Sequence, residues 1–242
     1  MIHGFLKACT VSPALRVADC AFNTQQTIAA MQRAALDGAQ LAVFPELGLT
    51  GYTCGDLFFQ QPLQRAAAKG LAAVLEASAD LDLVALVGLP VTVDGKLYNC
   101  AAVVCHGKLL GLVPKTYLPN YGEFYERRQF NPAPAGVRTL HFAGQEVPFG
   151  TQLLFRCAEM PEFCLGVEVC EDLWAPLPPS THHALAGATV IANLSASDET
   201  IGKADYRRAL VCQQSARLLC TYLYADAGHG ESTTDMVFAA HD

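Results

Sequence analysis

The sequence predicts an α/β fold in which helices alternate with strands around a mixed sheet. Apolar runs of strand length are separated by segments whose apolar residues recur at helical spacing. Some neighbouring strands are joined by turns too short to hold a helix, so the sheet combines parallel and antiparallel pairs. No linker, internal repeat or low-complexity segment interrupts the 242 residues. We therefore predict a single domain over residues 1–242.

In the first half of the chain, strand and helix signals follow one another closely. Residues 5–11 read as a strand, and Asn23 opens a helix because Gln26 three residues later completes a capping-box pattern. Residues 41–44 form a short apolar run that Pro45 ends. A helix over 61–79 carries apolar residues on one face. The next predicted strands are 83–89, 99–105 and 109–114, the last two joined by a turn at 106–108.

The second half continues the alternation. Residues 121–131 are polar and aromatic, which favours a loop with a short helical turn. Residues 164–170 and 189–194 are continuous apolar runs typical of buried strands, and a long helix is predicted from about 202 to 219. Residues 221–225 and 236–240 are the last predicted strands.

Composition excludes several classes of protein. Apolar residues make up 52% of the chain, which excludes an intrinsically disordered protein. Only 16% of residues are charged, against roughly 25% in typical soluble domains. We therefore expect part of the surface to be buried against another subunit, in a homo-oligomer, or against a further domain. The net charge of −7 disfavours nucleic acid and anionic membranes as partners.

The ten cysteines do not form a disulfide pattern. None has C-x-x-C spacing, and several lie inside apolar strand-like runs, where cysteine behaves as a small hydrophobe. Many such cysteines suggest a reducing compartment. The first residues lack the apolar core of a signal peptide, and no window approaches a membrane span. We expect a cytoplasmic protein.

Three predicted strand ends each deliver a reactive side chain into a loop: Glu46, Lys115 and Cys170. Taken singly, such residues are more often surface or core residues than catalytic ones. Together they supply a base, a cation and a thiol at the same topological position, where α/β folds gather their functional groups. The sequence contains no G-x-S-x-G hydrolase motif and no Rossmann or Walker nucleotide-binding motif. His182 and His183 are adjacent rather than spaced for zinc, so no metal site is expected.

These segments resemble the three motifs of the nitrilase (carbon–nitrogen hydrolase) superfamily, whose triad is Glu, Lys and Cys. The motifs here are Phe44-Pro45-Glu46, Pro114-Lys115 and Val169-Cys170-Glu171-Asp172. Longer strings at 46–52, 118–126, 193–197 and 230–235 are similar to the glutaminase domain of glutamine-dependent NAD synthetases. The resemblance covers nearly the whole chain. It implies an αββα sandwich of two mixed sheets, usually doubled across a subunit interface.

The chemistry can also be argued from the residues. A thiolate attacks an amide better than a thiol does, so Cys170 needs a base, for which Glu46 is the candidate. Lys115 and the backbone N–H of Glu171 are candidates to stabilise the oxyanion. The superfamily often has a second carboxylate that orients the lysine, and Glu123 lies where it is expected. An ordinary loop acid is an equally good interpretation of Glu123.

By the same resemblance, Tyr121, Ser197 and Lys203 fall at the glutamine-binding positions of the family. Lys203 provides a cation for the substrate's carboxylate, while Tyr121 and Ser197 provide hydroxyl or backbone contacts. Tyr52 and two further aromatic residues, Phe124 and Trp174, either wall the pocket or belong to the core.

The resemblance implies a glutamine amidohydrolase that supplies ammonia for the ATP-dependent amidation of deamido-NAD to NAD. The glutaminase part needs no cofactor, whereas ATP and Mg²⁺ belong to a synthetase domain whose pyrophosphate loop is missing from this sequence. We therefore expect a C-terminally truncated glutaminase domain that acts on L-glutamine with that synthetase domain as its partner. Two alternatives remain: a stand-alone amidase or carbamoylase of the superfamily, and a non-catalytic scaffold. The intact triad disfavours the scaffold.

Overall fold

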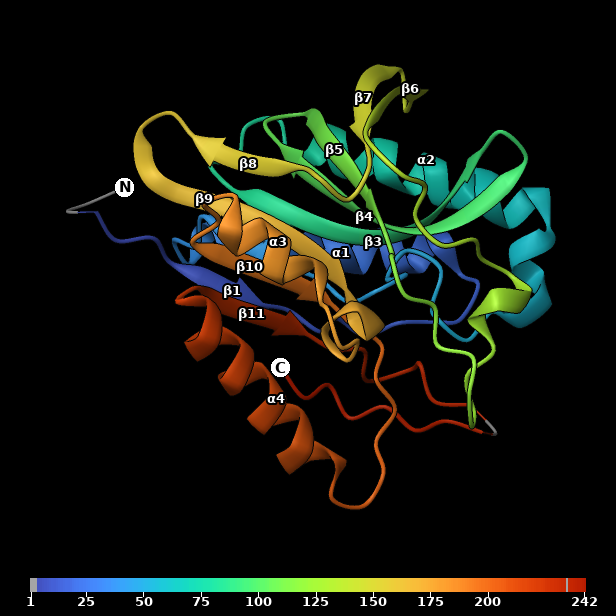
Figure 1. Ribbon diagram of the computed structural model, residues 1–242. Helices are drawn as coiled ribbons and strands as arrows, with labels where there is room; N and C mark the ends of the chain where they lie inside the picture. The colour runs from blue at the N-terminus through green and yellow to red at the C-terminus, as the bar shows by residue number, and fades with distance from the viewer. Residues whose placement is uncertain (1–3, 234) are drawn as a thin grey trace.

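The computed structural model describes residues 4–233 and 235–242 and shows two β-sheets packed face to face between two pairs of helices (Figure 1). Helices α1 (Cys20–Leu36) and α2 (Gln61–Ala77) cover the outer face of one sheet. Helices α3 (Pro179–Leu185) and α4 (Lys203–Leu218) cover the other. This arrangement is the αββα sandwich that the sequence resemblance implies.

Both sheets are mixed, as predicted. The larger has the order β1-β2-β3-β4-β5-β7-β6 and the smaller β11-β10-β9-β8. Parallel pairing links β1, β2 and β3, and also β9, β10 and β11, whereas β3, β4 and β5 are joined as antiparallel hairpins. The strands are β1 (Ala8–Thr10), β2 (Leu41–Val43), β3 (Val84–Val93), β4 (Lys96–Cys105), β5 (Lys108–Pro114), β6 (Arg138–Phe142), β7 (Gln145–Phe149), β8 (Leu154–Cys157), β9 (Met160–Val169), β10 (Val190–Leu194) and β11 (Thr221–Ala225).

The hairpins have local causes in the sequence. Asp94 and Gly95 join β3 to β4 with φ of 50° and 74°, and His106 and Gly107 join β4 to β5 with φ of 47° and 72°. Two consecutive residues with positive φ match the twist of the flanking strands, which is the usual two-residue hairpin geometry.

The core has two layers, because the side chains of each central strand alternate between the two faces of its sheet. On β3, Leu86 points into the space between the sheets, where it belongs to one cluster with Val167 and Leu194. Its neighbour Val87 points to the helix side and clusters with Met31 of α1. The outer face of the smaller sheet is different, because buried polar side chains such as Glu168 and Asn193 lie there.

Several predicted boundaries change. The first helix begins at Cys20 and not at Asn23, because Asp19 accepts a hydrogen bond from the Phe22 N–H at 3.0 Å and is the N-cap. Asn23 is instead buried within the helix, and its amide bonds the backbone of Arg16 through both its oxygen and its nitrogen. The strand predicted over 5–11 shortens to β1, which pairs only with the three residues of β2.

The strand predicted over 236–240 is wrong: the described part of this segment has no strand partner. Its backbone bonds loops instead, since the Glu199 N–H donates to the Val237 carbonyl and the Ala240 N–H donates to the Ala227 carbonyl. Among its strands and α-helices, the described part of the chain contains three strands and one helix that the sequence analysis missed: β6, β7, β8 and α3. None of the helices in the described part of the chain is long and apolar enough to span a membrane.

Candidate active site

Three strands of the sandwich end at one site. Glu46 follows β2, Lys115 follows β5 and Cys170 follows β9. The exposed fractions of these three residues are 1%, 1% and 6%. Because the sequence places them 69 and 55 residues apart, only the packing of the two sheets brings them together. Burial of an acid and a base is tolerated only where the charges are paired.

Glu46 is held through both carboxylate oxygens. Its Oε1 accepts hydrogen bonds from Lys115 Nζ at 2.6 Å and from Asn99 Nδ2 at 2.5 Å. Its Oε2 accepts from the backbone N–H of Ala196 at 3.1 Å. The donors come from β4, the end of β5 and the loop after β10, so the carboxylate is fixed by three separate parts of the fold.

Lys115 bridges two carboxylates. Its Nζ lies 2.6 Å from Glu46 Oε1 and 2.6 Å from Glu126 Oε1. Burial by itself would lower the pKa of Lys115, but the charges of Glu126 and Glu46 outweigh it and hold this pKa well above its ordinary value. The ammonium therefore stays charged, and with two of its three N–H groups occupied it has one left for a substrate oxygen.

Cys170 lies in a strained turn at the start of a 3₁₀ segment (Cys170–Leu173), with a φ of 46°. Positive φ is uncommon outside glycine and concentrates at functional sites. Burial and the charge of Glu46 raise the pKa of the Cys170 thiol well above its ordinary value, while Lys115 and a hydrogen bond from Ser195 act in the opposite direction. The resting group is a thiol, so a reaction at this sulfur needs a base to take its proton.

Asp172 joins the nucleophile's turn to the loop after Lys115. Its Oδ1 accepts from the N–H groups of Thr116 and Tyr117 at 3.0 and 2.8 Å, and its Oδ2 accepts from the Val169 N–H at 3.0 Å. The sequence analysis quoted Asp172 as part of a motif but gave it no role. Sequence alone does not reveal the link between Asp172 and the loop after Lys115, because Thr116 and Tyr117 lie 56 and 55 residues away in the chain.

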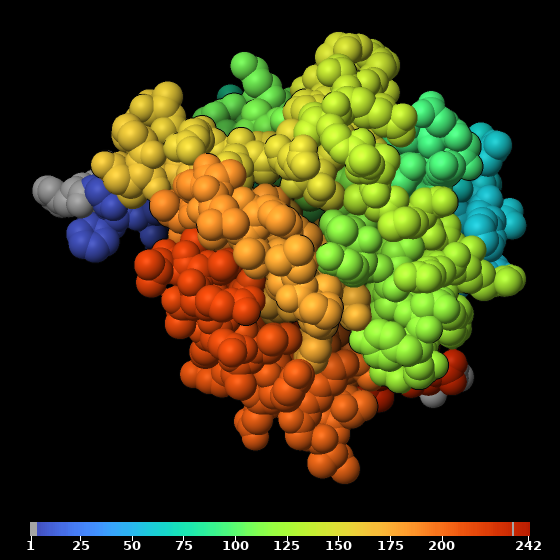
Figure 2. Space-filling view, in the orientation of Figure 1, coloured from blue at the N-terminus to red at the C-terminus, as the bar shows by residue number. Residues whose placement is uncertain are grey.

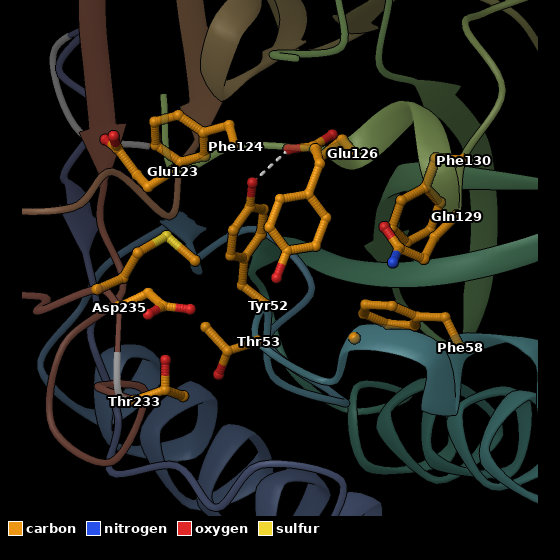
Figure 3. A pocket seen from close by; sticks show the side chains of 13 residues that line it. Tyr52, Thr53, Phe58, Glu123, Phe124, Glu126, Gln129, Phe130, Thr233 and Asp235 are labelled. Atoms are coloured by element: carbon orange, nitrogen blue, oxygen red, sulfur yellow. Dashed lines mark hydrogen bonds between the residues drawn. The ribbon is translucent and has the colours of Figure 1, made fainter. Parts of the chain in front are cut away.

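The second carboxylate beside Lys115 is Glu126, so the expectation for Glu123 is wrong. Glu126 Oε1 also accepts from the Tyr52 hydroxyl at 2.7 Å, a contact drawn in Figure 3. Burial raises the pKa of Glu126 to about 7, against the opposing effect of Lys115. Glu123 lies three residues earlier and its side chain lines the neighbouring cavities without contacting Lys115. Glu123 and Glu126 lie in the same loop, and the local sequence does not indicate which of the two side chains contacts Lys115.

Glu231 is a further buried acid that the sequence analysis did not assign. Its carboxylate accepts from the backbone N–H groups of Tyr52 and Thr53 at 2.9 and 2.8 Å and from the Thr53 hydroxyl at 2.7 Å. It thereby fixes the loop that carries Tyr52 against the lysine site. Tyr52 is therefore a buried support of the lysine site, through its hydrogen bond to Glu126, and does not line the cavity that contains Cys170.

A cavity of about 250 Å³ opens onto Cys170. It brings together all three residues expected to bind substrate, Tyr121, Ser197 and Lys203. The other lining residues are Pro119, Glu123, Phe124, Glu171 and Trp174. Figure 2 shows the green loop around residue 121 beside the orange segments of the second half of the chain, on one face of the molecule.

Opposite charges lie in this cavity. Lys203 forms an ion pair with Asp198, and its Nζ lies 5.6 Å from the ring centroids of both Phe124 and Trp174. Glu171 accepts a hydrogen bond from the Tyr121 hydroxyl at 3.0 Å, and burial raises the pKa of its carboxyl. The cavity is thus lined by a cation, Lys203, and a carboxylate, Glu171.

A second cavity, of about 210 Å³, is lined by Tyr52 and Phe124 among other residues (Figure 3). Phe58 and Phe130 form an edge-to-face pair at one end of it, with ring centroids 4.8 Å apart. Glu126 also lines this cavity, so the carboxylate that contacts Lys115 borders it. In the described ranges, 4–233 and 235–242, no three His, Cys, Asp or Glu side chains are grouped to hold a metal ion.

Comparisons with known proteins give consistent matches over most of the chain. Residues 8–227 match the carbon–nitrogen hydrolase family model. The chain is 46% identical over 236 residues to the glutamine-dependent NAD(+) synthetase of Mycobacterium tuberculosis, covering 98% of this chain and 35% of that protein. It is 31% identical over 214 residues to the rat enzyme of the same name, covering 84% and 29%. The chain therefore spans about a third of the length of these curated relatives.

Solved structures give the same result. A glutamine-dependent NAD(+) synthetase from Cytophaga hutchinsonii superposes with a TM-score of 0.86 at 28% identity, over 97% of this chain and 38% of that one. An amidase from Nesterenkonia sp. shares the fold with a TM-score of 0.73 at 21% identity, over 96% of this chain and 79% of that one.

Proposed function

The chain belongs to the carbon–nitrogen hydrolase family, and we propose that within this family it hydrolyses the side-chain amide of L-glutamine. The observation that carries the proposal is the cavity above Cys170, in which Lys203 and Glu171 provide opposite charges. A free amino acid has a carboxylate and an ammonium group, and these two residues complement them. The names of the relatives, which are glutamine-dependent synthetases, support the same substrate.

In the proposed first step, Cys170 Sγ attacks the amide carbon while its proton passes to Glu46. The carbonyl oxygen becomes an oxyanion, which the free N–H of Lys115 and the backbone N–H of Glu171 stabilise. The N–H of Cys170 itself is not available, since it already donates to Asn193 Oδ1 at 2.9 Å. The carbon–nitrogen bond then breaks, and Glu46 returns the proton so that ammonia leaves.

In the second step, water hydrolyses the γ-glutamyl thioester on Cys170. Glu46 takes a proton from this water, the carbon–sulfur bond breaks, and glutamate is released with the thiol restored. The fixed carboxylate of Glu46 therefore serves both halves of the cycle. Lys115 stabilises the oxyanion in both.

The ammonia would serve the ATP-dependent amidation of deamido-NAD to NAD, the reaction that the sequence resemblance implies; the relatives' name, glutamine-dependent NAD(+) synthetase, supports it. Since the chain spans 35% of the Mycobacterium tuberculosis relative, ATP and Mg²⁺ would be bound by a synthetase portion outside these residues. We also propose a homo-oligomer in the cytoplasm. The low charged fraction of 16% supports an extensive contact with other protein surface.

A stand-alone amidase is the second candidate, because the Nesterenkonia amidase shares the fold. The two are distinguished by measuring ammonia release from glutamine, acetamide and an N-carbamoyl amino acid. We expect glutamine to be preferred by about 10²-fold or more in kcat/KM, since Lys203 and Glu171 in the lining of the cavity together complement the carboxylate and the ammonium group of an amino acid. Preference for acetamide or the carbamoyl compound would contradict the proposal and favour the second candidate.

Mass spectrometry after treatment with diazo-oxo-norleucine, an electrophilic glutamine analogue, tests the nucleophile directly. Of the ten cysteines, Cys170 alone should carry the adduct. Labelling at Cys54 or Cys212 with Cys170 unmodified would contradict the assignment. Cys170→Ala is the matched control and should abolish both labelling and turnover.

A further inference from the structure

A row of buried polar side chains crosses the outer face of the smaller sheet, beneath α3 and α4. Glu168 on β9 and Asn193 on β10 face each other in the strand register, and both are 0% exposed. Tyr222 on β11 brings its hydroxyl to both of them. A buried acid on a face that would otherwise be apolar is costly unless it is fully bonded, and the mechanism above does not use it.

The hydrogen bonds in this row all donate toward Glu168, from Asn193 to Tyr222 and from Tyr222 to Glu168. The Tyr222 hydroxyl donates to Glu168 Oε1 and accepts from Asn193 Nδ2, the latter at 3.1 Å. The other oxygen of Glu168 accepts from the N–H of Ser180, at the start of α3, at 2.7 Å. Since a tyrosine hydroxyl has a single proton, its bond to the carboxylate leaves only a lone pair for Asn193. The Asn193 amide must then present its nitrogen to Tyr222.

The side-chain amide of Asn193 also forms hydrogen bonds with the backbone of Cys170. Asn193 Oδ1 accepts from the Cys170 N–H at 2.9 Å, and Nδ2 approaches the Cys170 carbonyl oxygen at 3.4 Å. Cys170 is the residue with a φ of 46°, a conformation that costs free energy for any residue with a side chain. One side chain therefore bonds both backbone groups of the strained residue.

We infer that Glu168, Tyr222 and Asn193 form a positioning relay that sets the direction of the Cys170 thiol. Asn193 holds the backbone of Cys170 in its left-handed conformation, and Tyr222 with Glu168 fixes the orientation of the Asn193 amide. If the amide turned over, its nitrogen would face the Cys170 N–H, and two donors would oppose each other. The three are positioning residues, since none of them lines the cavity above Cys170.

The relay explains why the outer face of this sheet carries polar residues. The same residues could have been apolar if the layer only joined the sheet to its helices, because replacing a buried polar network by packed apolar side chains is often neutral or stabilising. A role in placing the nucleophile gives the network a function that packing cannot supply. Misplacement of a reacting atom by about 1 Å can cost about 10²-fold in rate.

The test compares Asn193→Leu and Tyr222→Phe with the unchanged protein in two measurements. The first is the rate at which iodoacetamide alkylates Cys170, relative to the exposed Cys212 as an internal reference. The second is kcat and KM for glutamine, which rests on the proposed function. In Asn193→Leu we expect relative alkylation of Cys170 to fall about 10-fold and kcat about 10²-fold, with KM little changed. In Tyr222→Phe we expect both relative alkylation and kcat to fall by about 3- to 10-fold, the effect of one lost hydrogen bond.

Tyr98→Phe is the matched control, because Tyr98 is a buried tyrosine of the other sheet. It should leave both measurements unchanged. A folded Asn193→Leu protein, by circular dichroism, with wild-type alkylation and kcat overturns the inference. If Asn193→Leu does not fold, Tyr222→Phe decides, and wild-type values in it overturn the inference. If the unchanged protein does not hydrolyse glutamine while relative alkylation still falls in the variants, the relay stands and the proposed function fails.

Discussion

Lys115 Nζ and Glu46 Oε1 lie 2.6 Å apart between side chains that are both fully buried, although 69 residues separate them in the sequence. Neither side chain would remain ionised in this interior alone, because desolvation of a lone charge is too costly. Each therefore depends on the other, and Lys115 depends also on Glu126. Substitutions of Glu46, Lys115 or Glu126 therefore alter stability as well as rate, and the two effects require separate measurements.

Glu46→Gln should remove the base while keeping the size of the side chain. Loss of a general base typically lowers the rate by about 10²–10⁴-fold. The glutamine oxygen can still accept from Lys115 and Asn99, so the fold should persist. Single-turnover hydrolysis of glutamine, with circular dichroism as the folding control, measures the effect. A variant that retains most of the wild-type rate would show that another group is the base.

Lys115→Met should abolish most of the oxyanion stabilisation, a loss of about 3–4 kcal/mol in the transition state. It also leaves Glu46 and Glu126 without their cation, which typically destabilises a fold by about 3–5 kcal/mol. We therefore expect this variant to unfold easily, and the double variant Lys115→Met/Glu126→Gln to recover part of the stability. Lys115→Arg keeps the charge but replaces a compact ammonium by a longer planar group, and should also lose activity.

The folded double variant decides the role of Lys115. Its single-turnover rate is compared with that of Glu126→Gln alone, so that only the lysine differs. A rate equal to that of Glu126→Gln would rule out a catalytic role and leave Lys115 as a structural residue.

Glu126→Gln should change how stability depends on pH. The pKa of Glu126 rises from 4.5 to about 7 on folding, so the folded protein binds this proton more tightly than the unfolded chain does. Its contribution to the free energy of unfolding is complete below about pH 4.5 and is lost as pH rises to about 7. Urea unfolding measures the free energy of unfolding at pH 5 and at pH 8. The decrease in this free energy from pH 5 to pH 8 should be smaller in the variant than in the unchanged protein. Glu159→Gln, at an exposed position, is the control. If the free energy of unfolding decreases equally in Glu126→Gln and in the unchanged protein, the pKa of Glu126 is not raised.

Lys203→Met should weaken glutamine binding without changing the chemistry. Loss of a charged hydrogen bond to the substrate's carboxylate corresponds to a rise in KM of about 10- to 100-fold. The value of kcat should change little, because the hydrogen-bond and ion-pair partner of Lys203 is Asp198 and not a member of the triad. Lys69→Met, on the exposed side of α2, controls for the loss of a surface charge. If kcat falls while KM stays constant, Lys203 does not bind the substrate.

Much of the fold was predictable from local pattern. Helix α2 and helix α4 begin and end within two residues of their predicted bounds, and the central hairpins follow from apolar runs with turn residues between them. The missed elements had weak local signals. Strand β7 contains Pro148, and α3 has only seven residues and begins with a proline. Their stability comes from neighbouring strands and helices, which a local pattern does not contain.

The sequence by itself determined the chemical types at the site. Glu46, Lys115 and Cys170 were identifiable because each follows an apolar strand in a recognisable motif, and both the strand and the motif are local properties of the chain. Tertiary structure decided which buried polar side chains contact these three residues. Glu126 and not Glu123 contacts Lys115, and Asn193 bonds the backbone of Cys170. The physical reason is that a buried charge or amide needs partners from other strands. The register and packing of those strands are set only when the whole sandwich has formed.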